Sequence, residues 1–131
     1  MKWSVIVLLS LAGALMGAAS LFGLTRGIEL YLWIVIALTT AVVVARTTNQ
    51  KQFLHGFLSG TGMGIVNGIV QALFLPIYLS YNPDAAGQLS QNSFGFLPEV
   101  FIFLFSPVIG IVYGLVVGGV CAAAGKFYKP N

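Results

Sequence analysis

Charged residues are scarce in this sequence. It holds six Lys and Arg and three Asp and Glu among 131 residues, so 7% are charged, against roughly a quarter in a soluble globular domain. Hydrophobic residues make up 58%. This composition excludes an ordinary soluble domain and indicates that the chain lies in lipid. The length suits one compact membrane domain, so we expect a single domain over residues 1–131.

The residue types that carry most catalysis and metal binding are equally rare. There is one histidine, His55, one cysteine, Cys121, and three acids, Glu29, Asp84 and Glu99. The acids fall at one expected membrane surface and the other two residues fall near the opposite one. No nucleophile therefore has a base at useful spacing, and no cluster of metal ligands forms. We expect no enzyme, no cofactor and no metal site.

Acids are missing from every long apolar run, and the basic residues are scattered singly along the chain. Acids inside the membrane mark the ion pathways of coupled transporters, so their absence argues against proton- or cation-coupled transport. Isolated lysines and arginines do not form the basic patch that binds nucleic acid. We expect neither activity.

Long apolar runs, by contrast, are abundant. Four of them can cross a hydrocarbon core of about 30 Å as helices, and we predict spans at about residues 3–25, 28–46, 53–80 and 98–125. Residues 25–28 allow only a tight connection, so the first two spans form an antiparallel hairpin and the last two form a second one. The expected fold class is an all-α membrane protein with four transmembrane helices and glycine-rich helix packing.

Prolines and polar residues modify this outline in the second half of the chain. Pro76 and Pro107 fall inside the third and fourth spans and are expected to bend them, because proline removes a hydrogen bond of the helix. Residues 85–97 are rich in Gln, Ser, Asn and Gly. We predict that they form the one sizeable loop.

Glycine recurs every fourth residue in three of the predicted spans. The positions with this spacing are Gly13, Gly17, Gly56, Gly60, Gly64, Gly68, Gly110, Gly114 and Gly118. Four residues make slightly more than one helical turn, so each row leaves one helix face without side chains, and such faces let membrane helices pack closely. We predict that the third and fourth spans pack antiparallel along these rows within one four-helix unit. The alternative is a surplus glycine surface that builds an oligomeric pore.

A second row lies one residue before the glycines of the third span and is largely polar. Its members are His55, Ser59, Met63, Asn67 and Gln71. Asn67 and Tyr113 both fall near the middle of their spans, so we expect a hydrogen bond between them, which would stabilise packing by about 0.6 to 2 kcal/mol. In the favoured interpretation the row forms polar contacts that hold the bundle together. In the alternative it lines a small cavity. The candidate cavity residues are Thr61, Asn67, Gln71 and Tyr113.

The basic residues are distributed unevenly over the predicted topology. Lys2, Arg46, Lys51, Lys126 and Lys129 fall on one side, and Arg26 falls on the other side with the three acids. Short loops rich in Lys and Arg remain in the cytoplasm. We therefore expect a multi-pass protein of the bacterial inner membrane with both termini in the cytoplasm.

The second half of the chain carries a pattern that has a known counterpart. Basic and aromatic residues precede a glycine-rich span (Lys51, Phe53, Gly56, Phe57, Gly60), a Tyr-Asn-Pro-Asp segment follows at residues 81–84, and a glycine-spaced last span ends in lysines. This pattern over residues 51–126 resembles an uncharacterised bacterial family of small four-span membrane proteins. The family carries no known activity, so the resemblance implies a four-span fold and no function.

Two function classes remain after these exclusions. The absence of buried charge favours a non-catalytic integral membrane protein, an accessory or scaffold subunit that packs by its glycine-rich helices in a homo- or hetero-oligomer. Its expected partners are the lipid bilayer and other membrane subunits or further copies of itself, and no nucleic acid. The alternative is a small channel or uncoupled permease lined by the polar row of the third span.

Overall fold

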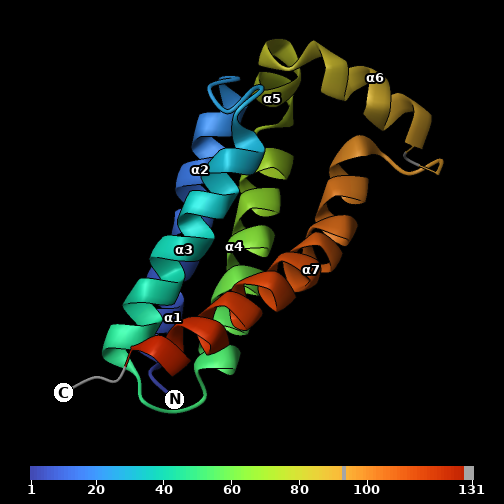
Figure 1. The fold of residues 1–131 in the computed structure, drawn as a ribbon. Coiled ribbons are helices and arrows are strands. Elements are labelled where there is room, and N and C mark those ends of the chain that lie inside the picture. Colours follow the sequence, from blue (N-terminus) through green and yellow to red (C-terminus); the bar gives the residue numbers. More distant parts are fainter. Residues whose placement is uncertain (93, 129–131) are drawn as a thin grey trace.

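Helices account for all regular secondary structure in the part of the chain that the structure describes. The computed structural model describes residues 1–92 and 94–128 and is 83% helix with no strand. The helices are α1 (Trp3–Ser10), α2 (Ala12–Leu21), α3 (Glu29–Thr47), α4 (Gln52–Leu73), α5 (Leu75–Tyr81), α6 (Pro83–Asn92) and α7 (Pro98–Phe127) (Figure 1).

Four helices are long and apolar enough to cross a membrane. α1 and α2 together form the first, over Trp3–Leu21, and α3, α4 and α7 form the other three. The shortest of the four have 19 residues, which at about 1.5 Å per residue nearly equals the thickness of the hydrocarbon core. The prediction of an all-helical chain with four apolar helices of this length is confirmed.

The predicted third span ends earlier than expected. α4 stops at Leu73, Phe74 leaves the helical conformation with φ −113° and ψ 32°, and α5 begins at Leu75 with Pro76 in its first turn. Pro76 lacks a backbone N–H, and its ring would clash with the carbonyl four residues earlier, so the helix breaks before the proline instead of bending through it. Pro107, in contrast, lies inside the continuous helix α7, which follows a curved course in Figure 1.

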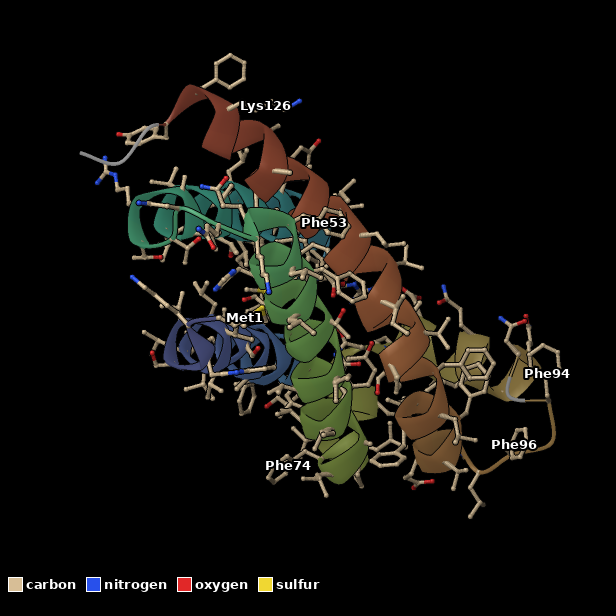
Figure 2. The ribbon with its side chains drawn as sticks, turned by 90° about the horizontal axis from the view of Figure 1, so that it is seen from below. Met1, Phe53, Phe74, Phe94, Phe96 and Lys126 are labelled. Carbon is tan, nitrogen blue, oxygen red and sulfur yellow. The ribbon has the colours of Figure 1, made fainter. Side chains whose placement is uncertain are left out.

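The loop predicted for residues 85–97 is wrong over most of its length, because Pro83–Asn92 form helix α6. Pro83 suits the first position of a helix, and Asp84 places a negative charge near the positive end of the helix dipole. None of the α6 side chains is buried, so the polar composition that suggested a loop reflects an exposed helix. Phe94 and Phe96 follow it, at the far side of the bundle from Met1 (Figure 2).

α4 is the central helix of the bundle. It contacts α1, α2 and α3, and its most extensive interface is with α7. Seen from below, α3 and the first apolar helix lie on one side of α4, and α7 runs along the other side (Figure 2). α3 packs mainly against α7, and its contacts with α2 are too few to form an interface, so the predicted antiparallel hairpin of the first two spans is not confirmed.

Small residues line the interface between α4 and α7. An ideal Cβ added to Gly60 would lie 2.8 Å from the Cα of Gly114, and one added to Gly56 would lie 2.9 Å from the Cα of Gly118. Real Cβ atoms essentially never approach another heavy atom within 3.0 Å. The two backbones therefore run closer together here than any residue with a Cβ would allow.

The two ends of the bundle differ in charge. One end, named the basic end, carries Lys2, Arg46, Lys51 and Lys126 together with the start of α1 and the end of α7 (Figure 1). The other, named the acidic end, carries Glu29, Asp84 and Glu99. Arg26 lies at the acidic end, where its guanidinium forms an ion pair with Asp84 at 2.7 Å. Lys129, which the sequence assigns to the basic side, lies outside the described residues.

Candidate functional site

A cavity of about 490 Å³ lies between α3, α4 and α7, in the half of the bundle toward the acidic end. Its apolar lining consists of Leu30, Trp33, Gly64, Gly68, Phe101, Ile102, Phe105 and Ile109. Its polar lining consists of Glu29, Asn67, Gln71, Ser106 and Tyr113. This volume and this mixture of many apolar and few polar groups are typical of sites for small molecules, which measure about 300–1,000 Å³.

The course of α7 creates this cavity. Toward the basic end, α3 and α7 share a core made of Ala37, Ala41, Val44, Val117 and Cys121. The rings of Trp33 and Tyr113 join the two helices where the cavity begins, with centroids 4.8 Å apart at an interplanar angle of 65°. Toward the acidic end α7 diverges from α3 (Figure 1). The cavity lies between these helices and α4.

Three of the four residues predicted to line a polar cavity do line this one. They are Asn67, Gln71 and Tyr113. Thr61 lies outside the lining, because its side chain faces the backbone of Gly114 on α7. The Thr61 Oγ1 is buried there and has no hydrogen-bond partner in the described part of the chain. The cavity is also more apolar than predicted, since aromatic and aliphatic side chains from α3 and α7 form most of its wall.

The predicted hydrogen bond between Asn67 and Tyr113 is wrong. The Tyr113 hydroxyl donates instead to the backbone carbonyl of Trp33 at 2.8 Å. The Oδ1 of Asn67 is buried and has no partner among the described residues. Tyr113 and Asn67 line the same cavity, but their side chains do not face each other. The Tyr113 side chain points toward α3, whereas Asn67 belongs to α4.

The rest of the polar row is packed inside the bundle. His55 is 2% exposed; its Nδ1 donates to the carbonyl of Lys51 at 2.9 Å, and its Nε2 accepts from the backbone N–H of Lys2 at 3.0 Å. Ser59 and Met63 are fully buried. The polar row therefore does not form one continuous accessible surface. Only its last two members, Asn67 and Gln71, line the cavity between α3, α4 and α7.

A second, polar cavity of about 470 Å³ lies at the basic end, with His55 in its wall beside Lys2 and Arg46. Ser59 and Met63, both without exposed surface, separate it along α4 from the cavity that holds Asn67. Over residues 1–92 and 94–128, no group of three or more His, Cys, Asp or Glu side chains could hold a metal ion.

A third cavity, about 340 Å³ in volume, lies against α6 and was not predicted from the sequence. It shares Gln71, Phe101 and Ile102 with the first cavity, so the two adjoin. Helix α6 forms one wall of this cavity, and the prediction of a loop at residues 85–97 did not include that helix. The Pro-Asp pair at residues 83–84 is the helix-start signal that could have revealed it.

No protein-family model, no curated protein and no solved structure matches this chain, so the resemblance of residues 51–126 to a bacterial four-span family stays a prediction.

Proposed function

We propose that the protein is a non-catalytic integral membrane protein of the bacterial inner membrane that serves as an accessory or scaffold subunit. In this proposal glycine-rich faces join the first apolar helix, α4 and α7, and α3 packs on α7 through Ala37, Ala41 and Val44, so that the four long helices form one unit. The outer surface of the unit packs against further copies of the protein or against other membrane subunits.

The glycine contacts support a closed four-helix unit. The rows in α4 and α7 face each other, and a Cβ on Gly17 of the first apolar helix would lie 2.9 Å from the Cβ of Val70 on α4. Gly13 faces the backbone of Met63 in the same way. Because these faces are already covered within one chain, a pore built by glycine faces between chains is disfavoured. Contacts with partners would then use large exposed side chains, such as Leu38 and Val35 on α3.

The burial of Ser59 and Met63 is the main observation that favours this proposal over a channel or permease. A solute that followed the polar row from His55 to Gln71 would have to pass both side chains, which have no exposed surface. The row therefore supports packing over conduction. A permease would need α1 and α2 to move away from α4, since Met63 packs beneath Gly13.

The position of the basic residues supports the orientation. Lys2 and Arg46 lie at the same end as Lys51 and Lys126, and Arg26, the one basic residue at the other end within residues 1–92 and 94–128, is paired with Asp84. An excess of Lys and Arg in short connections retains that side in the cytoplasm. This distribution supports the proposal that both termini lie in the cytoplasm.

Cysteine accessibility tests the proposal against the permease alternative. Ser59→Cys, in a Cys121→Ala background, places a nearly isosteric thiol in the fully buried part of the polar row. A membrane-impermeant thiol reagent is applied to right-side-out and inverted vesicles, because only a hydrated thiolate reacts readily. The proposal predicts no labelling of Ser59→Cys from either side, while Ser90→Cys on the exposed face of α6 is labelled from one side. Labelling of Ser59→Cys at the rate of Ser90→Cys would support a water-filled route and contradict the proposal.

A further inference from the structure

The polar cavity of about 470 Å³ at the basic end carries two cations in its wall. They are Lys2, just before α1, and Arg46, in the last turn of α3. Both residues are exposed, so a ligand can reach their charged groups. Most of the remaining lining is polar and comes from residues 47–50, at the end of α3 and in its connection to α4.

Contacts within the chain hold both cations in place. The Lys2 Nζ donates to the carbonyl of Thr47, and the Lys2 backbone N–H donates to the Nε2 of the buried His55 at 3.0 Å. The guanidinium of Arg46 donates to the Tyr128 hydroxyl at 3.0 Å, and its central carbon lies 5.4 Å from the centroid of that ring. An ammonium has three donors and a guanidinium has five. Each group therefore keeps donors for a ligand while its position is fixed, which lowers the entropic cost of binding.

The charges in the wall select an anion. Within residues 1–92 and 94–128, neither Lys2 nor Arg46 pairs with a carboxylate, and no acid lines the cavity. The three acids of the chain all lie at the acidic end. An anion placed between Lys2 and Arg46 would therefore meet two positive charges and no like charge. The exposed amides of Asn49 and Gln50 in the same lining offer further N–H donors.

The depth of the cavity identifies the anion. Apolar helices begin at Trp3 and Gln52 and end at Thr47, and the residues that line the cavity flank these positions. The cavity therefore lies where the hydrocarbon core gives way to the headgroups, and the anionic group that a bilayer presents there is a lipid phosphate. A zwitterionic headgroup adds an ammonium, which finds no carboxylate in the described lining. A phospholipid with a net negative charge is therefore preferred.

We propose that this cavity binds the phosphate group of an anionic phospholipid. Lys2 and Arg46 donate to the phosphate oxygens, and the acyl chains pass Trp3 into the bilayer. The volume of about 470 Å³ accommodates the headgroup. This inference goes beyond the accessory role and does not depend on it.

Trp3 provides a local readout. It is 62% exposed beside Lys2 and is one of two tryptophans in the chain, so Trp33→Phe leaves it as the only indole. The Trp33→Phe protein is placed in phosphatidylcholine nanodiscs that contain a fixed mole fraction of one brominated lipid, either phosphatidylglycerol or phosphatidylcholine. The chains are brominated close to the headgroup, where the bromine quenches a neighbouring indole. Excess quenching by the anionic lipid measures its preference for the cavity.

Two comparisons identify the ligand. We expect phosphatidylglycerol to bind on the order of twentyfold more tightly than phosphatidylcholine, since each of two basic groups contributes a factor of about five toward anionic lipid. Equal quenching by the two lipids would overturn the proposal. Inorganic phosphate, added at constant ionic strength, should displace the brominated phosphatidylglycerol no better than chloride does. Displacement by phosphate alone would assign the cavity to a soluble anion and overturn the lipid assignment.

Charge-removing variants separate the cavity from the general attraction of the basic end for anionic lipid. Arg46→Gln and Lys2→Gln should each lower the preference for phosphatidylglycerol about fivefold. Lys126→Gln removes the same charge at the same end, but Lys126 is outside the cavity lining and lies at the end of α7, away from Met1 (Figure 2). This control should retain the preference. An equal loss in all three variants would show that the surface charge, and not the cavity, attracts the lipid, which contradicts the proposal. The comparison of the two lipids on the Trp33→Phe protein stands independently of these variants.

Discussion

The Tyr113 hydroxyl donates a 2.8 Å hydrogen bond to the carbonyl of Trp33, and the two rings meet edge to face with centroids 4.8 Å apart. This pair joins α3 to α7, and both residues line the cavity. Toward the basic end the helices share a packed core, and toward the acidic end the cavity lies between them. The pair therefore sets the inner limit of the cavity.

Removing the hydroxyl of Tyr113 should weaken this junction modestly. Tyr113→Phe retains the ring contact with Trp33 and loses one interhelical hydrogen bond, so we expect a loss of about 0.5–1.5 kcal/mol in the free energy of unfolding. Tyr31→Phe is the matched control, because Tyr31 on α3 is 68% exposed. Unfolding of both variants in detergent, followed by circular dichroism, measures the difference. If the two variants are equally stable, the bond does not hold the helices together.

Glycine-dependent packing is tested by two identical substitutions. A Cβ on Gly64 would lie 2.9 Å from the backbone N of Gly110, whereas a Cβ on Gly119 meets nothing within 4 Å. Gly64→Ala should therefore destabilise the protein by about 1–3 kcal/mol through overpacking. Gly119→Ala should be neutral or stabilising by up to about 1 kcal/mol, because alanine favours the helix.

Thermal unfolding in detergent measures both glycine variants under the same conditions. Equal melting temperatures would mean that the close approach of α4 and α7 contributes nothing to stability, and the glycine rows would then need another explanation.

The proposed orientation of the chain rests on the position of its basic residues and can be tested by gene fusion. A phosphatase that is active only in the periplasm is attached after residue 131 in one fusion, and after Gly87 on α6 in a second. We expect the first fusion to be inactive and the second to be active. The reverse pattern would invert the topology and place Lys2 and Lys51 outside the cytoplasm.

The apolar helices could be predicted from the sequence because their signal is local. Uncharged runs of sufficient length have few structural solutions in lipid, and the helices α3 and α7 begin within a residue of the predicted positions. The ends near Pro76 were less predictable, because a proline permits either a bend or a break and the surrounding packing decides between them. α6 was missed because an exposed helix and a loop share the same polar composition.

The candidate site was only partly predictable for a different reason. Counting residues along a helix gives the depth of Asn67 and Tyr113, which is why both reach the same cavity. It does not give the direction of a side chain around the helix axis. That direction depends on how α7 crosses α3 and α4, so Tyr113 pairs with Trp33 and Thr61 faces Gly114. The aromatic wall of the cavity comes from the same crossing and has no local signal in the sequence.

We propose that the protein works as a subunit that packs against other membrane proteins. Native mass spectrometry of the protein released from lipid nanodiscs tests it most directly, because it counts copies, partner subunits and bound lipids in one measurement. We predict masses that correspond to several copies of the chain or to the chain with a second membrane subunit. A single mass for one copy, with lipid but no protein partner at native expression levels, would contradict the claim.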